Sequence, residues 1–161
     1  MKLFLAVCIF LLIGGCSENA STNIDEIDHF PTQEEAIAHF VEVENITGNI
    51  DLVTTTKREL LLVSQLKQDI YFVGEVKENT EGYDAVKLSA SFKIGFGAAW
   101  EFNTMDNEKY TISFEKSNEK PNLIRLSNDE YYISIVEGHT LNRSLFNGTN
   151  AIKEARTIKS K

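Results

Sequence analysis

The chain has 161 residues, of which 24 are acidic and 16 are basic, and its net charge at pH 7 is −8. This balance disfavours nucleic-acid binding and adhesion to anionic lipid headgroups, because both need clustered cations. The imbalance lies near the start of the chain, since residues 17–56 carry nine acidic side chains and neither Lys nor Arg. The length suits one folded domain rather than two.

The first predicted element is a signal peptide over residues 1–15. Lys2 precedes an unbroken run of 11 apolar residues, from Leu3 to Ile13. A transmembrane helix needs roughly 20 apolar residues, so the run is too short to span a bilayer and has the length of a signal-peptide core. Two glycines separate the run from Cys16.

The stretch Ile13-Gly14-Gly15-Cys16 resembles the bacterial lipobox, in which a cysteine is acylated on sulfur and the chain is cleaved before it. The resemblance implies that Cys16 is the lipidation site, and that the protein is anchored on the extracytoplasmic face of the cell membrane of a Gram-positive bacterium. Each buried methylene of an acyl chain contributes about 0.8 kcal/mol to such anchoring. The alternative is an ordinary signal peptide in which Cys16 is incidental.

A tether and a helix are predicted next. Residues 16–29 are polar and acidic, which predicts a flexible tether, and a single domain is predicted over residues 30–161. Thr32 and Glu35 have the T-x-x-E spacing of a capping box, which marks the start of a helix. The helix is amphipathic and is expected to end before Gly48, since its apolar residues recur at helical spacing. These residues are Ala36, Ile37, Phe40 and Val41.

The remainder of the chain has the pattern of strands and turns. We predict strands over residues 50–56, 59–65, 70–78, 83–94, 109–116, 122–127 and 130–137. Apolar and polar residues alternate most clearly in 83–94, which is typical of an antiparallel sheet with one buried face, and the close spacing of the runs excludes parallel crossovers.

The predicted fold class is therefore α+β. An N-terminal amphipathic helix is expected to pack on one face of a curved antiparallel β-sheet, a meander of about five to seven strands. The large apolar residues of the helix and of the inward strand faces should be buried where the two meet. This expectation covers Phe40, Leu88, Phe92, Ile112 and Phe114.

The whole chain resembles the short lipoproteins of unknown function found in Bacillus-type bacteria. The resemblance rests on the lipobox, on the helix start "PTQEEAI" at residues 31–37, and on strands rich in Asn, Lys and Ile. It implies an envelope location and brings no catalytic residues with it.

The segment "KIGFGAAWEF", residues 93–102, concentrates aromatic side chains beside two glycines. Gly95 and Gly97 bracket Phe96, and Trp100 follows. The glycines can let a loop present Phe96 or Trp100 to a partner, or they can make a bulge that leaves the rings in the core. We expect Trp100 to be mostly buried and Phe96 to be the more exposed ring.

Few residues suggest catalysis or metal binding. His139 and Arg143 lie in the polar stretch "EGHTLNRS", which is either a small-ligand loop or a loop without a site. His29 is assigned to the tether, and His39 is expected to form a solvated pair with Glu35. The stretch "TMDNEK", residues 104–109, is interpreted as a hairpin turn because it lacks calcium-loop spacing. We expect neither a metal nor a cofactor.

Two functions remain at this point. The first is a non-catalytic interaction module of the cell envelope that binds a protein, a peptide or a wall component, with the membrane contacted through lipid on Cys16 and no nucleic-acid partner. The alternative is a hydrolase-like enzyme acting on envelope material, with His139 as acid or base.

Overall fold

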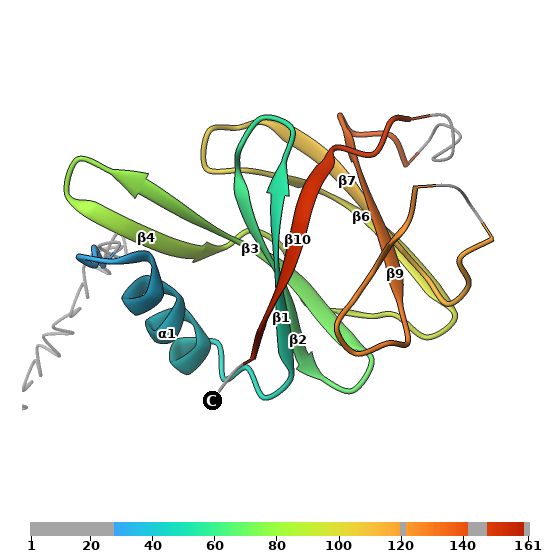
Figure 1. The fold of residues 1–161 in the computed structure, drawn as a ribbon, viewed down its shortest axis with the longest axis horizontal. Coiled ribbons are helices and arrows are strands. Elements are labelled where there is room, and N and C mark those ends of the chain that lie inside the picture. Colours follow the sequence, from blue (N-terminus) through green and yellow to red (C-terminus); the bar gives the residue numbers. More distant parts are fainter. Residues whose placement is uncertain (1–27, 120–121, 142–147, 160–161) are drawn as a thin grey trace, which may run out of the picture.

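The computed structural model describes residues 28–119, 122–141 and 148–159 (Figure 1). The predicted signal peptide, Cys16 and Arg143 therefore lie outside the described residues. No helix in the described ranges is long and apolar enough to cross a membrane. The elements in chain order are α1 (Gln33–Val43), β1 (Asn49–Thr55), β2 (Leu60–Lys67), β3 (Ile70–Asn79), β4 (Gly82–Lys87), β5 (Phe92–Lys93), β6 (Gly97–Asn103), β7 (Lys109–Glu115), β8 (Ile124–Arg125), β9 (Tyr132–Glu137) and β10 (Ile152–Lys159).

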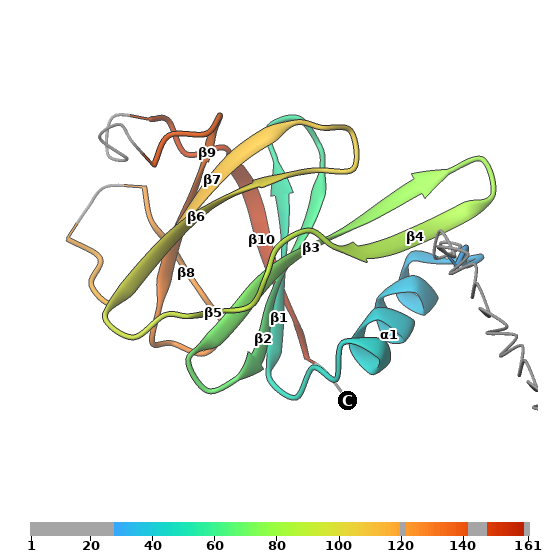
Figure 2. The same ribbon diagram turned by 180° about the vertical axis from the view of Figure 1, so that it is seen from behind.

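The strands form two antiparallel sheets, which pack face to face as the two views in Figures 1 and 2 show. The first is six-stranded, with the order β10-β1-β2-β3-β4 and with β5 paired to β3; the second is four-stranded, with the order β6-β7-β9-β8. Antiparallel sheet with one short helix fits the predicted α+β class. The prediction of a single sheet is wrong, and the helix lies at residues 33–43.

The larger hydrophobic core lies between the two sheets. Ile112 and Phe114 of β7 are fully buried in it, so their burial is confirmed, but the expected contact with the helix is wrong. Its buried residues are Val53, Leu61, Val63, Tyr71, Val73, Ile94, Trp100, Phe102, Tyr110, Ile112, Phe114, Leu126, Tyr131, Ile133, Ile135 and Ala151. The inter-sheet core therefore consists of inward-facing residues from both sheets.

A second core lies between α1 and the other face of the six-stranded sheet. Phe40 is buried there as predicted, and its ring centroid lies 5.9 Å from that of Phe72 on β3. Gly74 makes this approach possible, because a Cβ at that position would lie 2.5 Å from the Phe40 ring. The core consists of Ala36, Ile37, Phe40, Ile46, Ile50, Leu52, Leu62, Phe72 and Val76. The six-stranded sheet is thus buried on both faces.

Both ends of α1 are fixed by local hydrogen bonds. Thr32 is the N-cap, and its hydroxyl accepts the backbone N–H of Glu35 at 3.2 Å, as the capping spacing predicted. At the other end Asn45 adopts a left-handed conformation with φ 53°, and the N–H of Ile46 donates to the carbonyl of Val41 at 3.0 Å. This is the hydrogen-bond pattern of a Schellman motif, which ends the helix.

The predicted strand over residues 83–94 is interrupted. Strand β4 ends at Lys87, and the Val73 carbonyl then accepts two N–H groups, from Leu88 at 2.9 Å and Ser89 at 3.2 Å. The chain therefore leaves the ladder and returns to β3 only as the short strand β5. Because the alternation is broken, Leu88 is half-buried and Phe92 is 36% exposed, so their predicted burial at the helix is wrong.

The domain begins slightly earlier than the predicted boundary. The His29 ring contacts the carboxylates of Asp84, at 2.5 Å, and Glu81, at 2.8 Å, so the assignment of His29 to a free tether is wrong. His39 pairs with Asp28 at 3.2 Å rather than with Glu35. The start of the described chain is therefore held against α1 and the β3–β4 hairpin.

Candidate functional site

A tight turn joins β5 to β6 and carries the most exposed large apolar side chain of the described chain. The N–H of Gly97 donates to the carbonyl of Ile94 at 3.0 Å, and Gly95 between them has φ 58°. A turn with a positive φ at its second residue favours glycine there. The Tyr131 hydroxyl oxygen also lies 3.2 Å from the Gly95 carbonyl oxygen, so a side chain from next to β9 contacts the turn.

Phe96 and Trp100 have opposite environments, as predicted. Phe96 is 96% exposed, whereas Trp100 is 4% exposed and lies in the inter-sheet core. Trp100 is stacked between two rings, with centroid distances of 4.6 Å to Phe92 and 5.1 Å to Phe114. A column of rings therefore runs from the half-exposed Phe92 into the inter-sheet core, which Phe96 does not join.

Three exposed lysines lie on the segments that meet near this turn. The Lys116 ammonium lies 6.0 Å from the centroid of the Phe96 ring, and Lys93 and Lys67 occupy exposed positions on β5 and at the end of β2. The Asp69 carboxylate accepts the Tyr131 hydroxyl at 2.8 Å, and Glu115 lies opposite Gly97 in the β6–β7 ladder, so acidic groups are present as well. We call Phe96 with Lys67, Lys93 and Lys116 the aromatic tip.

The aromatic tip lies far from the point where the described chain begins. Phe30, near that point, is bridged to Tyr83 of β4 by two backbone hydrogen bonds of 2.9 and 2.7 Å. Figure 2 shows α1 and the β3–β4 hairpin at one end of the molecule and the β5–β6 turn at the other. A chain anchored through its N-terminal segment would therefore present the tip away from its anchor.

His139 is not part of this tip. Its Nε2 atom lies 3.3 Å from the carbonyl oxygen of Phe102 and its Nδ1 atom 3.8 Å from the Glu101 carboxylate, at the opposite end of β6 from Phe96. Within residues 28–119, 122–141 and 148–159 no hydroxyl is hydrogen-bonded to the His139 ring. These contacts orient the ring against β6 and supply no nucleophile next to it.

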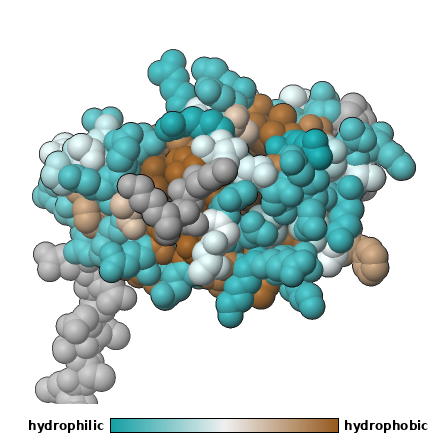
Figure 3. Space-filling model, turned by 60° about the horizontal axis from the view of Figure 1, so that its bottom comes forward, coloured by the Kyte–Doolittle hydropathy of each residue, from teal (hydrophilic) through white to brown (hydrophobic). Residues whose placement is uncertain are grey.

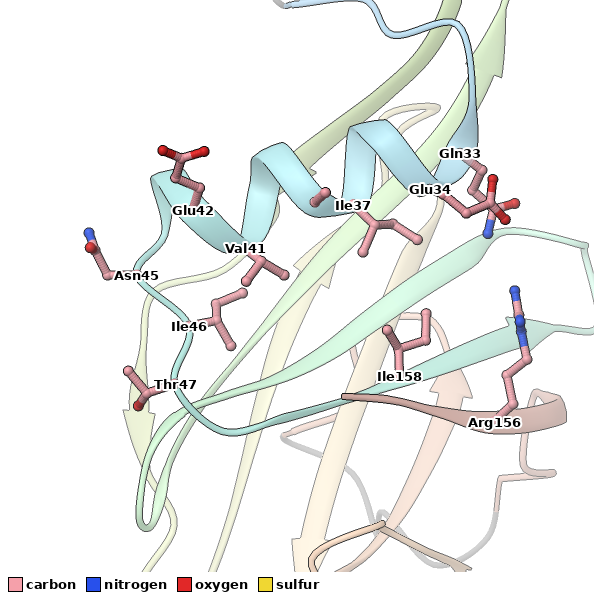
Figure 4. A pocket seen from close by; sticks show the side chains of 11 residues that line it. Gln33, Glu34, Ile37, Val41, Glu42, Asn45, Ile46, Thr47, Arg156 and Ile158 are labelled. Atoms are coloured by element: carbon pink, nitrogen blue, oxygen red, sulfur yellow. The ribbon is translucent and has the colours of Figure 1, made fainter. Parts of the chain in front are cut away.

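An apolar groove separates α1 from the edge of the six-stranded sheet, and sequence reasoning did not find it. The groove has a volume of about 750 Å³, and Figure 3 shows hydrophobic surface in a hollow of this face. Ile37 and Val41 of α1 face Ile158 of β10 across it (Figure 4). The remaining lining residues are Gln33, Glu34, Ala38, Glu42, Asn45, Ile46, Thr47 and Arg156. The lining residues come from two distant parts of the sequence, so no local motif predicts the groove.

A polar pocket of about 480 Å³ lies where the β1–β2 and β6–β7 turns meet β3. Glu75 is 2% exposed, and burial raises the pKa of its carboxyl, which accepts the N–H of Met105 at 2.7 Å. Lys77 pairs with Asp106 at its rim. The "TMDNEK" stretch forms the predicted hairpin turn here, and these contacts hold the turns together.

The described part of the chain contains no group of three His, Cys, Asp or Glu side chains that could hold a metal ion. The strongest candidate for recognition is therefore the aromatic tip, with the apolar groove as a second exposed feature. No protein-family model, no curated protein and no solved structure matches the chain.

Proposed function

We propose that this protein is a lipid-anchored interaction module of the bacterial cell envelope, which binds a partner through the aromatic tip. The observation that carries the proposal is the 96% exposure of Phe96 on a hydrogen-bonded turn. A large exposed ring on a fixed backbone loses little conformational freedom on binding, and aromatic side chains of this kind are enriched among interaction hot spots.

The anchor in this proposal is an acyl group on Cys16, for which the lipobox-like sequence is the support. The acidic segment that follows it supports a domain held away from anionic membrane surfaces, because like charges repel. The position of the tip, opposite the start of the described chain, suits a partner that lies farther from the membrane.

The chemistry of the tip favours a protein or peptide partner with an apolar pocket rimmed by carboxylates. Burying a Phe side chain contributes about 1.5–3 kcal/mol. Lys116 beside the ring, with the exposed Lys67 and Lys93, would meet acidic residues, which steer the encounter and select among partners. A wall polymer lacks such a pocket.

A photoreactive aromatic residue at position 96 tests the tip in intact cells that make the full chain. We expect one covalent adduct with an envelope protein, and none from the same residue at position 43, because Val43 is an exposed apolar side chain on α1. With the purified partner, Phe96→Ala should weaken binding about 30-fold, the effect of losing a hot spot.

The same experiment gives two outcomes that contradict the proposal. Equal adducts from positions 43 and 96 would mean that the tip is not selective. A partner whose affinity is unchanged by Phe96→Ala, with Val43→Ala as the matched control, would place the contact elsewhere. Adducts with glycan alone would exclude the protein partner.

The anchor is tested separately by Cys16→Ala. We expect the variant to be released from the membrane or to remain as an uncleaved precursor, because no sulfur is left to carry acyl chains. Cell fractionation and metabolic labelling with a fatty acid measure this. A correctly processed form that stays in the membrane fraction would contradict lipid anchoring.

A further inference from the structure

Strand β10 forms an open edge of the six-stranded sheet. In the described part of the chain it pairs with β1 alone, and Lys153, Glu154, Arg156 and Thr157 are all exposed. An edge strand of this kind presents backbone N–H and C=O groups that can pair with another strand. Whether it does so depends on the side chains along it.

The pairing with β1 fixes which way those side chains face. Glu154 and Arg156 lie opposite Thr54 and Leu52, so they share the helix-side face with Ile158. Ala155 lies between them on the inter-sheet face, where it packs against the larger core. A register shift places an irregularity at Lys153, so the regular strand begins at Glu154.

The two-fold axis of a pair formed with a second copy of this strand must pass through a single residue, because side chains that meet across an antiparallel pair must lie on the same face of the sheet. Centring the two-fold axis on residue 154 or on residue 156 places like charges opposite each other. Centring it on Thr157 or on Ile158 leaves both charges unpaired. Centring it on Ala155 places Glu154 opposite Arg156 of the second copy, twice.

We propose that β10 pairs with β10 of a second copy of this chain about a two-fold axis at Ala155. Two Glu154–Arg156 pairs then lie on the helix-side face, and like-charge repulsion excludes the neighbouring registers. The two six-stranded sheets become one continuous sheet. The apolar groove of each copy, which Arg156 and Ile158 line, then faces the new sheet junction.

This interface uses residues at a different place from the aromatic tip, so it stands independently of the proposed function. A dimer of this kind would carry two tips, and a partner with two sites would then be bound with higher avidity.

Charge reversal tests the register, with sedimentation equilibrium of the full chain in detergent as the measurement. We expect a reversible dimer. Glu154→Arg and Arg156→Glu should each weaken it at least about tenfold, because each reversal turns two attractive pairs into two repulsive ones. The double variant restores both pairs and should dimerise like the unchanged chain. Circular dichroism melting confirms that all variants are folded.

A cysteine at position 155 gives a second, register-specific measurement. Opposed residues of an antiparallel pair have Cα atoms about 4.5–5.5 Å apart, within the range of a disulfide. Ala155→Cys should therefore form a linked dimer on oxidation, whereas Lys153→Cys should not, in a chain whose Cys8 and Cys16 are replaced by serine. A monomeric unchanged chain, or single reversals without effect, would overturn the proposal.

Discussion

The two faces of the six-stranded sheet are buried in different ways. The inter-sheet core contains six buried aromatic rings among its residues, and the helix-side core contains two. The inter-sheet rings are also in mutual contact, as the stacked column of Phe92, Trp100 and Phe114 shows. Because aromatic side chains bury the largest areas, the inter-sheet core supplies most of the hydrophobic stabilisation.

One end of the inter-sheet core is closed by hydrogen bonds between the sheets. Asp51 of β1 accepts both the backbone N–H and the hydroxyl of Ser127, and Asn128 donates to the Tyr71 hydroxyl at 2.6 Å. On the helix side, Lys87 of β4 pairs with Glu44 at the end of α1, but α1 covers β3 and β4 and leaves the groove beside β10. Exposed apolar surface and the open strand edge therefore lie where the cover is incomplete.

The largest effect is expected from truncating a ring of the inter-sheet core. Trp100→Ala should lower the free energy of unfolding by about 3–5 kcal/mol, because it leaves a cavity between Phe92 and Phe114. Thermal or denaturant unfolding followed by circular dichroism measures this loss. The tryptophan fluorescence of the unchanged chain should also be blue-shifted and resist a neutral quencher.

Phe96→Ala is the matched control, because Phe96 lies four residues before Trp100 in the chain and is fully exposed. Its stability should stay within about 0.5 kcal/mol of the unchanged chain. If the two variants lost equal free energy of unfolding, burial of Trp100 would contribute no more to stability than the exposed Phe96 ring does. That result would contradict the comparison.

Local patterns in the sequence predicted the helix and most of the strands. The N-cap at Thr32 and the apolar spacing around Phe40 depend on neighbours within a few residues, and the structure confirms both. The turn at 104–109 and the strand that follows it are confirmed for the same reason, whereas β6, the strand before it, was not predicted. Exposure of Phe96 and burial of Trp100 could be predicted because glycines frame only the first ring.

Features that depend on long-range pairing could not be predicted. Strand β10 was missed because its apolar residues Ile152, Ala155 and Ile158 do not alternate: Ala155 faces the inter-sheet core, Ile158 faces the helix side, and an irregularity at Lys153 interrupts the pairing. The division into two sheets was missed because alternation shows that a strand has an inward face, not which sheet it joins. The groove and the polar pocket combine turns and strands distant in sequence.

The helix-side core should respond less strongly than the inter-sheet core. Phe40→Ala is expected to lower the free energy of unfolding by about 3 kcal/mol, the low end for such a truncation, because the groove beside α1 lets the helix shift into the space. Hydrogen exchange should accelerate in Gln33–Val43 more than in β7. Equal acceleration in both would show that the two cores unfold as one unit.

The smallest effect is expected in the pH dependence of stability. It distinguishes the contribution of Asp51, which joins the two sheets, from that of His29, which contacts Asp84 of β4. Burial raises the pKa of the Asp51 carboxyl, although hydrogen bonds from Ser127 and Thr157 lower it in part. The hydrogen bond to Asp84 raises the pKa of His29, with burial acting against it. In both cases the folded state favours the protonated form.

A group whose pKa is raised on folding adds stability below its unfolded pKa, and this stability is lost as pH rises through the folded pKa. Asp51 should therefore reduce stability as pH rises above the ordinary carboxyl range, and His29 as pH rises above the ordinary histidine range, near 6.5. Asp51→Asn should reduce the pH dependence of stability just above the ordinary carboxyl range. His29→Gln should reduce it only above the ordinary histidine range. Denaturant midpoints measured across this range test both. If Asp51→Asn leaves the acidic part of the profile unchanged, folding does not raise the pKa of the Asp51 carboxyl, and the hydrogen bonds from Ser127 and Thr157 fully offset the effect of its burial.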